Sequence, residues 1–449
     1  PVISFESDIE DAIARYFSDT DQHGALEAMM DEISGADTNM EIVMDRDDDE
    51  MDLSVQVDDA PIIKLVNAVI SEAINQRASD IHVEPYEHMV RLRYRIDGVL
   101  QERPSPPKKF QNAIVSRIKI LSEMDIAEKR LPQDGRIRIR FEGRDIDFRV
   151  GYLPCRYGEK IVLRILDKGS LTLDLDLLGF EAQPMEAFRN ALARPNGMVL
   201  MTGPTGSGKT TTLYSALHKL NSREVNIVTV EDPIEYDLEG INQVQVHASI
   251  GLTFAEALRQ ILRQDPDIVM VGEIRDQETA DVSVKAALTG HLVLSTLHTN
   301  DASGVFPRLI DMGLEPFLVQ SSVVLAAAQR LLKKVCPECK QRVEVGQDVL
   351  QRIQFAPMPG DPPPTFVQGR GCHTCKDTGY KGRVAVIEAM PNYPEVGRLV
   401  LQKASGMQIK TVAMENGMRT LRQNALAKAA QGVTSISQVL EHTIDDQIM

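Results

Sequence analysis

Apolar residues recur at helical spacing early in the chain and alternate with polar residues in the segments that follow. The stretch 60–76, APIIKLVNAVISEAINQ, carries an apolar stripe and predicts a helix that begins near Pro61. The segments ASDIHVEP and VRLRYRIDGVL alternate with a period of two, which predicts strands. A helix is expected at about 110–126, then a hairpin in IRIRFEGRDIDFRV and a strand at 159–166. These elements predict a compact α/β domain over residues 57–168.

A second pattern, in which short apolar strands alternate with helices, begins at the strand MVLMTG. The strands NIVTVE, DIVMVGE and LVLSTLH follow, separated by helical segments such as TTLYSALHKLN and ETADVSVKAAL. Such alternation predicts a parallel sheet with helices on both faces. We expect this doubly wound α/β core over residues 185–330, joined to the first domain by a linker at 169–184. Two C-x2-C segments then mark a region at 331–382, and a helical C-terminal region is expected at 383–449.

Length and composition are those of a globular protein with more than one domain. The chain has 449 residues, of which 43% are hydrophobic, with no apolar run long enough to span a bilayer and no signal-peptide pattern. We therefore expect a cytoplasmic protein. Residue 1 is Pro rather than Met, which suggests a processed or truncated chain.

Acidic residues are concentrated at the start of the chain. The net charge is −16, but residues 1–60 contain 19 Asp or Glu and 2 Arg, and the rest carries 46 acids against 47 bases. Residues 1–56 combine a short helical module, DIEDAIARYFSD, with the acidic run DRDDDEMD. Such a run is typical of a solvated linker, with a docking role as the alternative.

The segment GPTGSGKT, at 203–210, follows an apolar strand and precedes a helix, as a phosphate-binding P-loop requires. Backbone N–H groups of such a loop surround phosphate oxygens at a helix N-terminus. Lys209 is expected to reach the β and γ phosphates, and Thr210 to offer its hydroxyl to Mg²⁺. We therefore expect ATP and Mg²⁺ here. The expected nucleotide-binding residues of the loop are Gly203, Pro204, Thr205, Gly206, Ser207, Gly208, Lys209, Thr210 and Thr211.

Two glutamates end apolar strands that follow the P-loop. Glu231 ends the strand in TVEDPIEY, and Glu273 ends VMVGE, where a P-loop ATPase normally has an aspartate in place of Gly272. Because the carboxyl ends of parallel strands meet at one sheet edge, both carboxylates are expected near the phosphates, dividing Mg²⁺ binding and water activation between them. His298 ends the strand in LTGHLVLSTLHTND and is expected to sense the γ phosphate, whereas His291 is expected to be structural.

Four of the five cysteines form two closely spaced pairs. CPEC and CHTC give C-x2-C twice, with 32 residues between the pairs, and Cys155 is left over. Paired thiols at this spacing in a cytosolic chain indicate tetrahedral, structural Zn²⁺, with redox thiols as the alternative. The expected zinc ligands are Cys336, Cys339, Cys372 and Cys375.

Four blocks stand in one order: GPTGSGKTTTLY, TVEDPIEY, DPDIVMVGEIRD and LTGHLVLSTLHTND. They resemble the Walker A motif, Asp box, atypical Walker B motif and His box of the secretion ATPase superfamily. With SDIHVEP, RYRIDGVL, DIAEKRLPQDGR and the four cysteines, residues 57–449 resemble its type IV pilus assembly and type II secretion branch. The resemblance implies a RecA-like ATPase domain preceded by a smaller, PAS-like α/β domain. It also makes Gly272 a family trait.

The resemblance further implies a homohexamer in which arginines of the small domain complete an ATP site on the large one. They fall on Arg149 and Arg164, and Arg259 and Arg263 would line the site from the large domain. A guanidinium from a mobile domain stabilises transition-state charge. Such a ring is expected to polymerise pilin through an inner-membrane platform protein and a cytoplasmic assembly protein. It would be cytoplasmic and peripheral to the inner membrane.

Three other functions stay open at this point. A type II secretion motor shares every motif quoted above, although RYRIDGVL and the acidic linker favour the pilus branch. A nucleic-acid translocase is disfavoured by the near-neutral body and by only 5% aromatic residues, so we expect no nucleic-acid partner. A nonhydrolysing nucleotide-dependent scaffold is disfavoured by the intact Lys209, Glu231 and Glu273.

Overall fold

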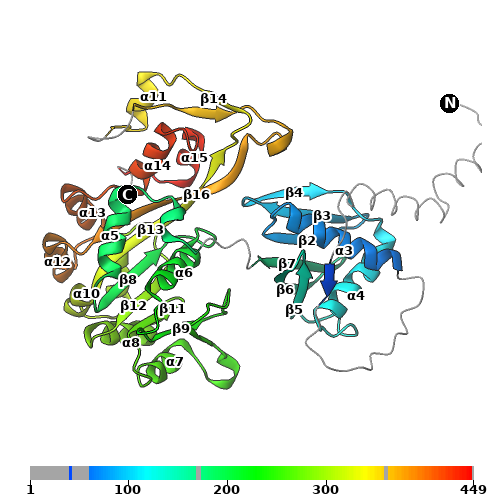
Figure 1. The fold of residues 1–449 in the computed structure, drawn as a ribbon, viewed down its shortest axis with the longest axis horizontal. Coiled ribbons are helices and arrows are strands. Elements are labelled where there is room, and N and C mark those ends of the chain that lie inside the picture. Colours follow the sequence, from blue (N-terminus) through cyan, green and yellow to red (C-terminus); the bar gives the residue numbers. More distant parts are fainter. Residues whose placement is uncertain (1–39, 43–59, 168–172, 358–362, 447–449) are drawn as a thin grey trace, which may run out of the picture. The chain divides into compact units, whose positions relative to one another are not determined.

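The computed structural model describes residues 40–42, 60–167, 173–357 and 363–446. The chain divides into two compact units, Pro1–Leu171 and Thr172–Met449 (Figure 1). The helical module expected in residues 1–56 lies outside the described residues. Within the described part of the chain, no helix combines the length and the apolar character needed to cross a bilayer.

The first unit contains a seven-stranded antiparallel sheet with the strand order β1-β5-β6-β7-β2-β3-β4. Strand β6 alternates buried and more exposed residues, as the period-two pattern predicts. The expected hairpin joins β5 to β6 through a turn at Gly143, whose φ of 75° suits glycine. The strands are β1 Met40–Ile42, β2 Asp80–Pro85, β3 Val90–Ile96, β4 Val99–Arg103, β5 Gln133–Phe141, β6 Arg144–Cys155 and β7 Gly158–Asp167.

Two helices, α3 (Ala60–Asn75) and α4 (Gln111–Leu121), share one apolar core with this sheet. Residues of both helices and of β2, β3, β5, β6 and β7 are buried together in it. Helix α4 ends five residues earlier than the expected boundary at 126. The cause is local, because Glu123 has a φ of 57°, which is incompatible with a continuing helix.

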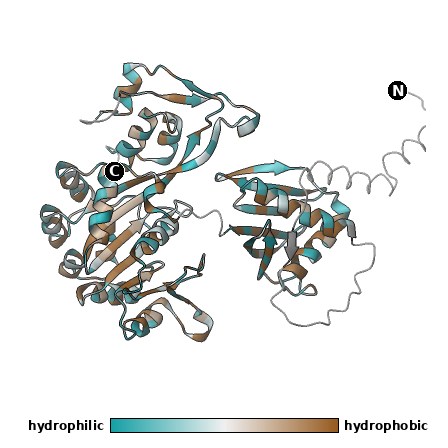
Figure 2. Cartoon of the chain, viewed as in Figure 1, coloured by the Kyte–Doolittle hydropathy of each residue, from teal (hydrophilic) through white to brown (hydrophobic). Residues whose placement is uncertain are grey.

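The second unit is built on a seven-stranded mixed sheet with the order β10-β9-β11-β12-β8-β13-β16. All neighbouring pairs are parallel except β13 and β16, which are antiparallel. Its central strands are largely hydrophobic along their length (Figure 2). The strands are β8 Gly197–Thr202, β9 Ile227–Glu231, β10 Asn242–Gln245, β11 Ile268–Val271, β12 Leu292–Leu297, β13 Val323–Val335 and β16 Tyr380–Pro391.

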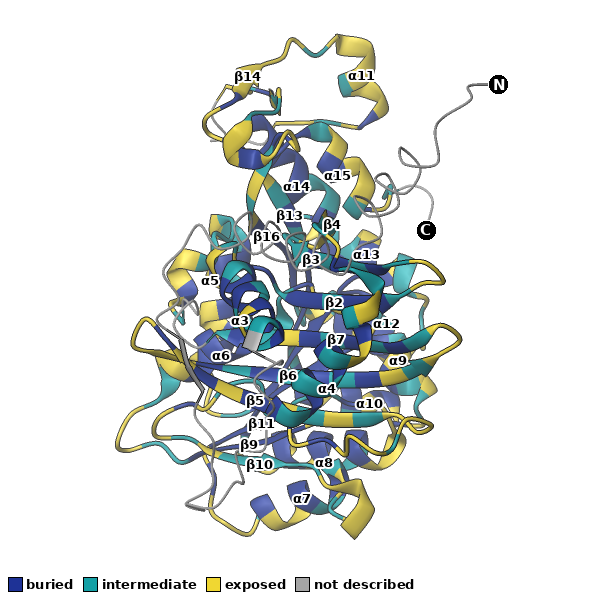
Figure 3. Ribbon diagram, turned by 90° about the vertical axis from the view of Figure 1, so that its right-hand side faces the viewer, coloured by how far each residue is buried: buried dark blue, intermediate teal, exposed yellow. Residues whose placement is uncertain are grey.

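Helices cover both faces of this sheet, so the expected doubly wound α/β class is confirmed. In β8, Met198 and Leu200 join the core on one face, and Val199 and Met201 join the core on the other. Helices α5 and α6 cover the second of these faces, and the strands β8, β9, β11 and β12 are buried throughout (Figure 3). The layer helices are α5 Ala182–Leu192, α6 Lys209–Leu220, α7 Phe254–Ile261, α8 Gln277–Leu288, α9 Val305–Asp311 and α10 Pro316–Ser322.

The C-terminal region differs in one respect from the helical region expected at 383–449. It begins within β16, which extends the main sheet, and β13 also continues past 330 into the cysteine region. The alanines of both strands lie in their buried stretches, and this tertiary environment overrides the helical propensity of those alanines. The remaining elements are a two-stranded sheet of β14 Lys340–Arg342 and β15 Val367–Gly369, with α11 Gln347–Arg352, α12 Pro394–Leu401, α13 Gly406–Glu415, α14 Leu421–Ala430 and α15 Ile436–His442.

Candidate functional site

The P-loop connects the end of β8 to the start of α6. Its glycines Gly203, Gly206 and Gly208 have φ values of 141°, 78° and 87°, in the region that L side chains rarely adopt. A Cβ on Gly203 would lie 2.5 Å from the carbonyl oxygen of Gln329, so only glycine fits there. The loop therefore has the backbone that lets N–H groups converge on an anion at the N-terminus of α6.

Lys209, the first residue of α6, folds back over this loop. Its Nζ donates to the carbonyl oxygens of Gly203 at 2.8 Å and Pro204 at 3.1 Å. Burial lowers the pKa of Lys209, and attraction to the Glu273 carboxylate opposes that shift. The ammonium group is thus held at the loop and lies within the electrostatic influence of Glu273, while Thr210 beside it is exposed.

Gln329 of β13 holds the P-loop in place through its side-chain amide. The sequence analysis did not identify this residue. Its Nε2 donates to the carbonyl oxygen of Ser207 at 2.9 Å, and its Oε1 accepts from the Thr212 hydroxyl at 2.8 Å. The side chain is buried. A single amide therefore connects the loop, the first turn of α6 and the neighbouring strand. The only signal in the sequence was a polar residue directly after an alanine run.

Glu231 lies at the carboxyl end of β9, but its carboxylate is fully engaged. Only 3% of the residue is exposed, and it accepts hydrogen bonds from Tyr214, from Thr229 Oγ1 at 2.6 Å and from Gln243 Nε2 at 3.1 Å. Tyr214 belongs to α6, so Glu231 ties that helix to the sheet. This arrangement supports a positioning role for Glu231 as well as the metal-binding role expected of it, which stays a prediction.

Glu273 occupies the same edge with a freer carboxylate. It forms an ion pair with Arg275, and its Oε2 lies 3.3 Å from Nε2 of His298. Its side chain is 14% exposed. A Cβ on the preceding Gly272 would lie 3.3 Å from the carbonyl oxygen of Val230, a tight contact with β9. The acid of this strand end is Glu273, one residue after Gly272.

Together, Lys209, Glu273 and His298 lie at one edge of the sheet, where β8 leads into α6 and where β11 and β12 end. Strand β12 pairs in parallel with both β8 and β11, which brings the three ends to one edge. The Thr202 hydroxyl, at the end of β8, accepts from the Thr299 N–H at 2.7 Å and so links the P-loop strand to the His298 loop. This is a site that can hold a polyphosphate and place a carboxylate and an imidazole beside it.

Of the two arginines expected to line the site from the second unit, Arg259 lies on α7 and Arg263 follows that helix. Arg259 pairs with Glu256 at 3.4 Å and with Glu278. Within the described residues, no hydrogen bond or ion pair joins Arg259 or Arg263 to the P-loop. Their assignment to the nucleotide stays a prediction.

Arg149 and Arg164 belong to the first unit and stand directly opposite each other on β6 and β7. The Nε of Arg164 donates to Oδ1 of the buried Asp80 at 3.0 Å. Because this bond uses Nε, it orients the guanidinium while Arg164 itself stays exposed. The role of both arginines at a nucleotide site stays a prediction.

The four cysteines of the two C-x2-C pairs gather into one cluster. Their sulfur atoms all lie within 4.8 Å of one another, with separations of 3.9 Å for Cys336 and Cys372, 3.8 Å for Cys339 and Cys375, and 3.7 Å for Cys372 and Cys375. These distances are far too long for disulfides, whose S–S bond is about 2.05 Å. A zinc tetrahedron with Zn–S bonds of about 2.3 Å has edges of about 3.8 Å.

The surroundings of the cluster also fit thiolate ligands. The Gly379 N–H points at Cys375 Sγ at 3.3 Å, and the Cys372 N–H does so at 3.2 Å. Although burial opposes it, these donors lower the pKa of Cys375 to about 7. The four residues therefore suit Zn²⁺, and Cys155 stands apart as an exposed thiol on β6 of the first unit.

Comparison with known proteins gives one family match over most of the chain. The model of the family described as "Type II/IV secretion system protein" matches residues 55–441. The chain is 50% identical to "Type IV pilus assembly ATPase PilB" of Myxococcus xanthus, over 99% of this chain and 78% of that protein. It is 49% identical to "Type II secretion system protein E" of Klebsiella pneumoniae, over 88% of this chain and 78% of that protein.

Two solved structures share the fold. The pilus retraction motor PilT with bound ADP has a TM-score of 0.58 and 25% identity, covering 85% of this chain and 97% of PilT. The ATPase DotB of Legionella pneumophila has a TM-score of 0.59 and 21% identity, covering 84% of this chain and 94% of DotB.

Proposed function

Because the chain belongs to the type II/IV secretion system protein family, we propose that it is a hexameric motor, driven by ATP hydrolysis, that assembles type IV pili. The family is one of ATPases, and the resemblance expected from the four sequence blocks is confirmed at that level. One observation carries the proposal. A complete P-loop with Lys209 shares a sheet edge with the Glu273–His298 pair.

The residues divide the work of hydrolysis as follows. Lys209 and the P-loop backbone bind the β and γ phosphates, which fixes the γ phosphorus relative to Glu273. Glu273 accepts a hydrogen bond from the attacking water and takes up its proton, because its carboxylate is less engaged than that of Glu231. His298 orients Glu273 and senses the γ phosphate.

Mg²⁺ fits the oxygen donors at this edge. Thr210 and Glu273 offer an exposed hydroxyl and a less engaged carboxylate, the hard ligands that this ion prefers, and the buried Glu231 carboxylate would act on the ion through water. When bound, Mg²⁺ would neutralise charge on the phosphate oxygens. Zn²⁺ would be held by the four cysteines and would stabilise the region around β14 and β15.

The active form is a homohexamer in which the first unit of one subunit completes the site of the next. Arg149 and Arg164 would supply positive charge that a P-loop subunit needs in the transition state, and the fixed orientation of Arg164 by Asp80 supports this role. The ring would act in the cytoplasm on an inner-membrane platform protein, together with a cytoplasmic assembly protein. It would be peripheral to that membrane through these partners and would not bind nucleic acid.

Type II secretion is the second candidate, favoured by the 49% identity to a type II secretion protein E. Gene deletion in the organism that encodes the chain separates the two pathways. Loss of surface pili with normal secretion of exported enzymes is the expected result. Loss of secretion with normal piliation would assign the chain to type II secretion.

A further inference from the structure

Glu388 is a fully buried carboxylate in the last strand of the sheet, β16. Only 1% of the residue is exposed. Its Oε1 accepts a hydrogen bond from the backbone N–H of Ala302 at 2.9 Å, and its Oε2 accepts one from the N–H of Leu421, also at 2.9 Å. One side chain therefore joins two backbone segments that are far apart in the sequence.

The first of these segments is the loop that carries His298. Ala302 lies four residues after His298, and the loop between them is also hydrogen-bonded to β8 and β13. Thr299 donates to Thr202 at the end of the P-loop strand, at 2.7 Å, and Arg330 donates to the Asn300 carbonyl oxygen at 2.8 Å. The Glu388 bond thus joins this loop to β16.

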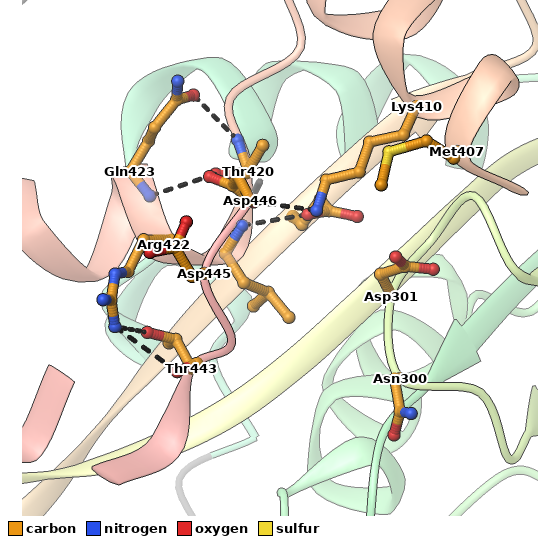
Figure 4. A network of polar contacts seen from close by, with 12 residues as sticks. Asn300, Asp301, Met407, Lys410, Thr420, Arg422, Gln423, Thr443, Asp445 and Asp446 are labelled. Carbon is orange, nitrogen blue, oxygen red and sulfur yellow. Dashed lines mark hydrogen bonds and ion pairs between the residues drawn. The ribbon is translucent and has the colours of Figure 1, made fainter. Parts of the chain in front are cut away.

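The second segment is the start of α14. Leu421 is the first residue of that helix, and the preceding Thr420 is its N-cap. The Thr420 hydroxyl donates to Oδ2 of Asp446 at 2.7 Å, and Lys410 of α13 donates to Oδ1 of the same carboxylate at 2.7 Å. Figure 4 shows Lys410 directed at Asp446, with Asp301 of the His298 loop close by. Helices α13 and α14 and the segment after α15 are thereby held as one group.

Burial and a neighbouring negative charge make the ionised form of this carboxylate energetically unfavourable. Burial, together with the charge of Asp301, raises the pKa of Glu388 to about 7, while its two N–H donors and Lys410 oppose the shift. A buried charge of this kind is weak evidence for stability, because an apolar side chain of similar size is often at least as stabilising. What an apolar side chain would not provide is a simultaneous bond to both N–H groups.

We propose that Glu388 is a positioning residue that couples the His298 loop to the first turn of α14, an inference that rests on nucleotide hydrolysis at the P-loop. Displacement of α13 and α14 by a bound protein would then pull on Ala302 and change the position of His298 beside Glu273. Conversely, phosphate binding that moves the His298 loop would displace the first turn of α14. The coupling needs a single acceptor group that reaches both segments, and Glu388 is that group.

The variant Glu388→Gln tests this directly, because it keeps the size of the side chain. An amide has one oxygen, so one of the two N–H groups must face the NH2 group and lose its acceptor. Hydrogen exchange of the full chain is measured with and without a nonhydrolysable ATP analogue. In the wild type, the analogue should slow exchange both in residues 298–304 and in the first turn of α14. In Glu388→Gln, the α14 response should disappear.

Turnover gives a second readout on the same variant. We expect Glu388→Gln to lower kcat by about 10-fold or more, because misplacing a group near the reacting atoms by about 1 Å can cost about 100-fold. The KM for ATP should stay within about twofold, since the P-loop is untouched. Asp446→Asn is the matched control. It disturbs the same polar group of helices but leaves both Glu388 bonds, so it should retain the α14 response and a kcat close to that of the wild type.

A second pair of variants removes the bond from the helix side. Leu421→Pro deletes the N–H donor at the first helical position, where proline is tolerated, and Thr420 before it already has the extended backbone that proline requires (φ −71°, ψ 163°). Leu421→Ala shortens the side chain but keeps the N–H. Only Leu421→Pro should abolish the α14 response, with the response of residues 298–304 retained.

Two results would overturn the coupling: an α14 response that persists in Glu388→Gln and Leu421→Pro, or a wild type whose α14 does not respond to the analogue at all. An equal loss of kcat in Glu388→Gln and Asp446→Asn would also contradict it, since that would indicate general destabilisation. If the wild type bound the analogue but did not hydrolyse ATP, the proposed function would fail, while the exchange comparison would still decide whether Glu388 couples the segments.

Discussion

The imidazole Nε2 of His298 lies 3.3 Å from Oε2 of Glu273, joining the ends of the neighbouring strands β12 and β11. The imidazole is half exposed, whereas the carboxylate is mostly buried. The Glu273 carboxylate also attracts the Lys209 ammonium group electrostatically. The histidine is therefore placed to hold the carboxylate in one orientation while its own outer edge stays open to a ligand.

His298→Ala should lower kcat by about 10- to 100-fold, because Glu273 loses the group that orients it. ATP affinity should change little, since the P-loop bonds are intact. Steady-state phosphate release and equilibrium nucleotide binding measure the two effects separately. His291→Ala is the control: its Nδ1 lies 3.0 Å from the Ala286 carbonyl oxygen, and this variant should retain turnover. Equal losses in both variants would mean that His298 has no special role.

Gln329→Ala should destabilise the P-loop side of the sheet. The substitution leaves the Ser207 carbonyl oxygen and the buried Thr212 hydroxyl without their partner, which costs about 1–3 kcal/mol in the free energy of unfolding. Chemical denaturation and ATP affinity are measured together, and both should decrease. Gln341→Ala, at an exposed position of β14, should change neither. Unchanged stability in Gln329→Ala would show that the amide does not support the loop.

Sequence reasoning succeeded where a short apolar run ends at a chemically distinctive residue. Glu231, Glu273 and His298 end buried strands of one parallel sheet, and the rule that such ends meet at one edge was enough to bring them together. It made no prediction for β13, because an alanine-rich run has no intrinsic strand preference and is extended here between its neighbours β8 and β16.

Sequence patterns also could not predict polar contacts between residues that are far apart in the sequence. The partners of Gln329 lie more than 100 residues away, and those of Glu388 lie 86 and 33 residues away. Nothing local to either residue specifies such a contact. The structure likewise gave Glu231 a set of hydrogen-bond donors that no motif indicated.

Zinc binding is expected to stabilise the cysteine region alone. Cys336→Ser should release about one metal ion per chain and loosen the segment around β14 and β15, because a structural zinc site contributes directly to folding. Metal analysis and limited proteolysis measure the two effects. Cys155→Ser should keep its metal, since Cys155 is not one of the four clustered cysteines. Purified wild-type protein without zinc would rule out the site.

Catalysis is expected to need neighbouring subunits. Arginines supplied by an adjacent subunit add about 10³ to 10⁵ in rate at other P-loop sites, so a chain with Arg149→Ala and Arg164→Ala should be nearly inactive. Mixing it with a Glu273→Gln chain should restore some activity, because some interfaces then join intact arginines to an intact Glu273. Full activity in a demonstrably monomeric preparation, or no rescue in assembled mixed rings, would contradict the shared site.

The most direct test of the central claim measures ATP binding and phosphate release side by side in the wild type, Lys209→Ala and Glu273→Gln. Under the proposed mechanism, Lys209 binds phosphate in the ground state and Glu273 acts on the attacking water. Both variants should therefore lose turnover, and only Glu273→Gln should still bind ATP. Glu231→Gln completes the set as the alternative base. Normal hydrolysis by Glu273→Gln together with its loss in Glu231→Gln would contradict the assignment of Glu273.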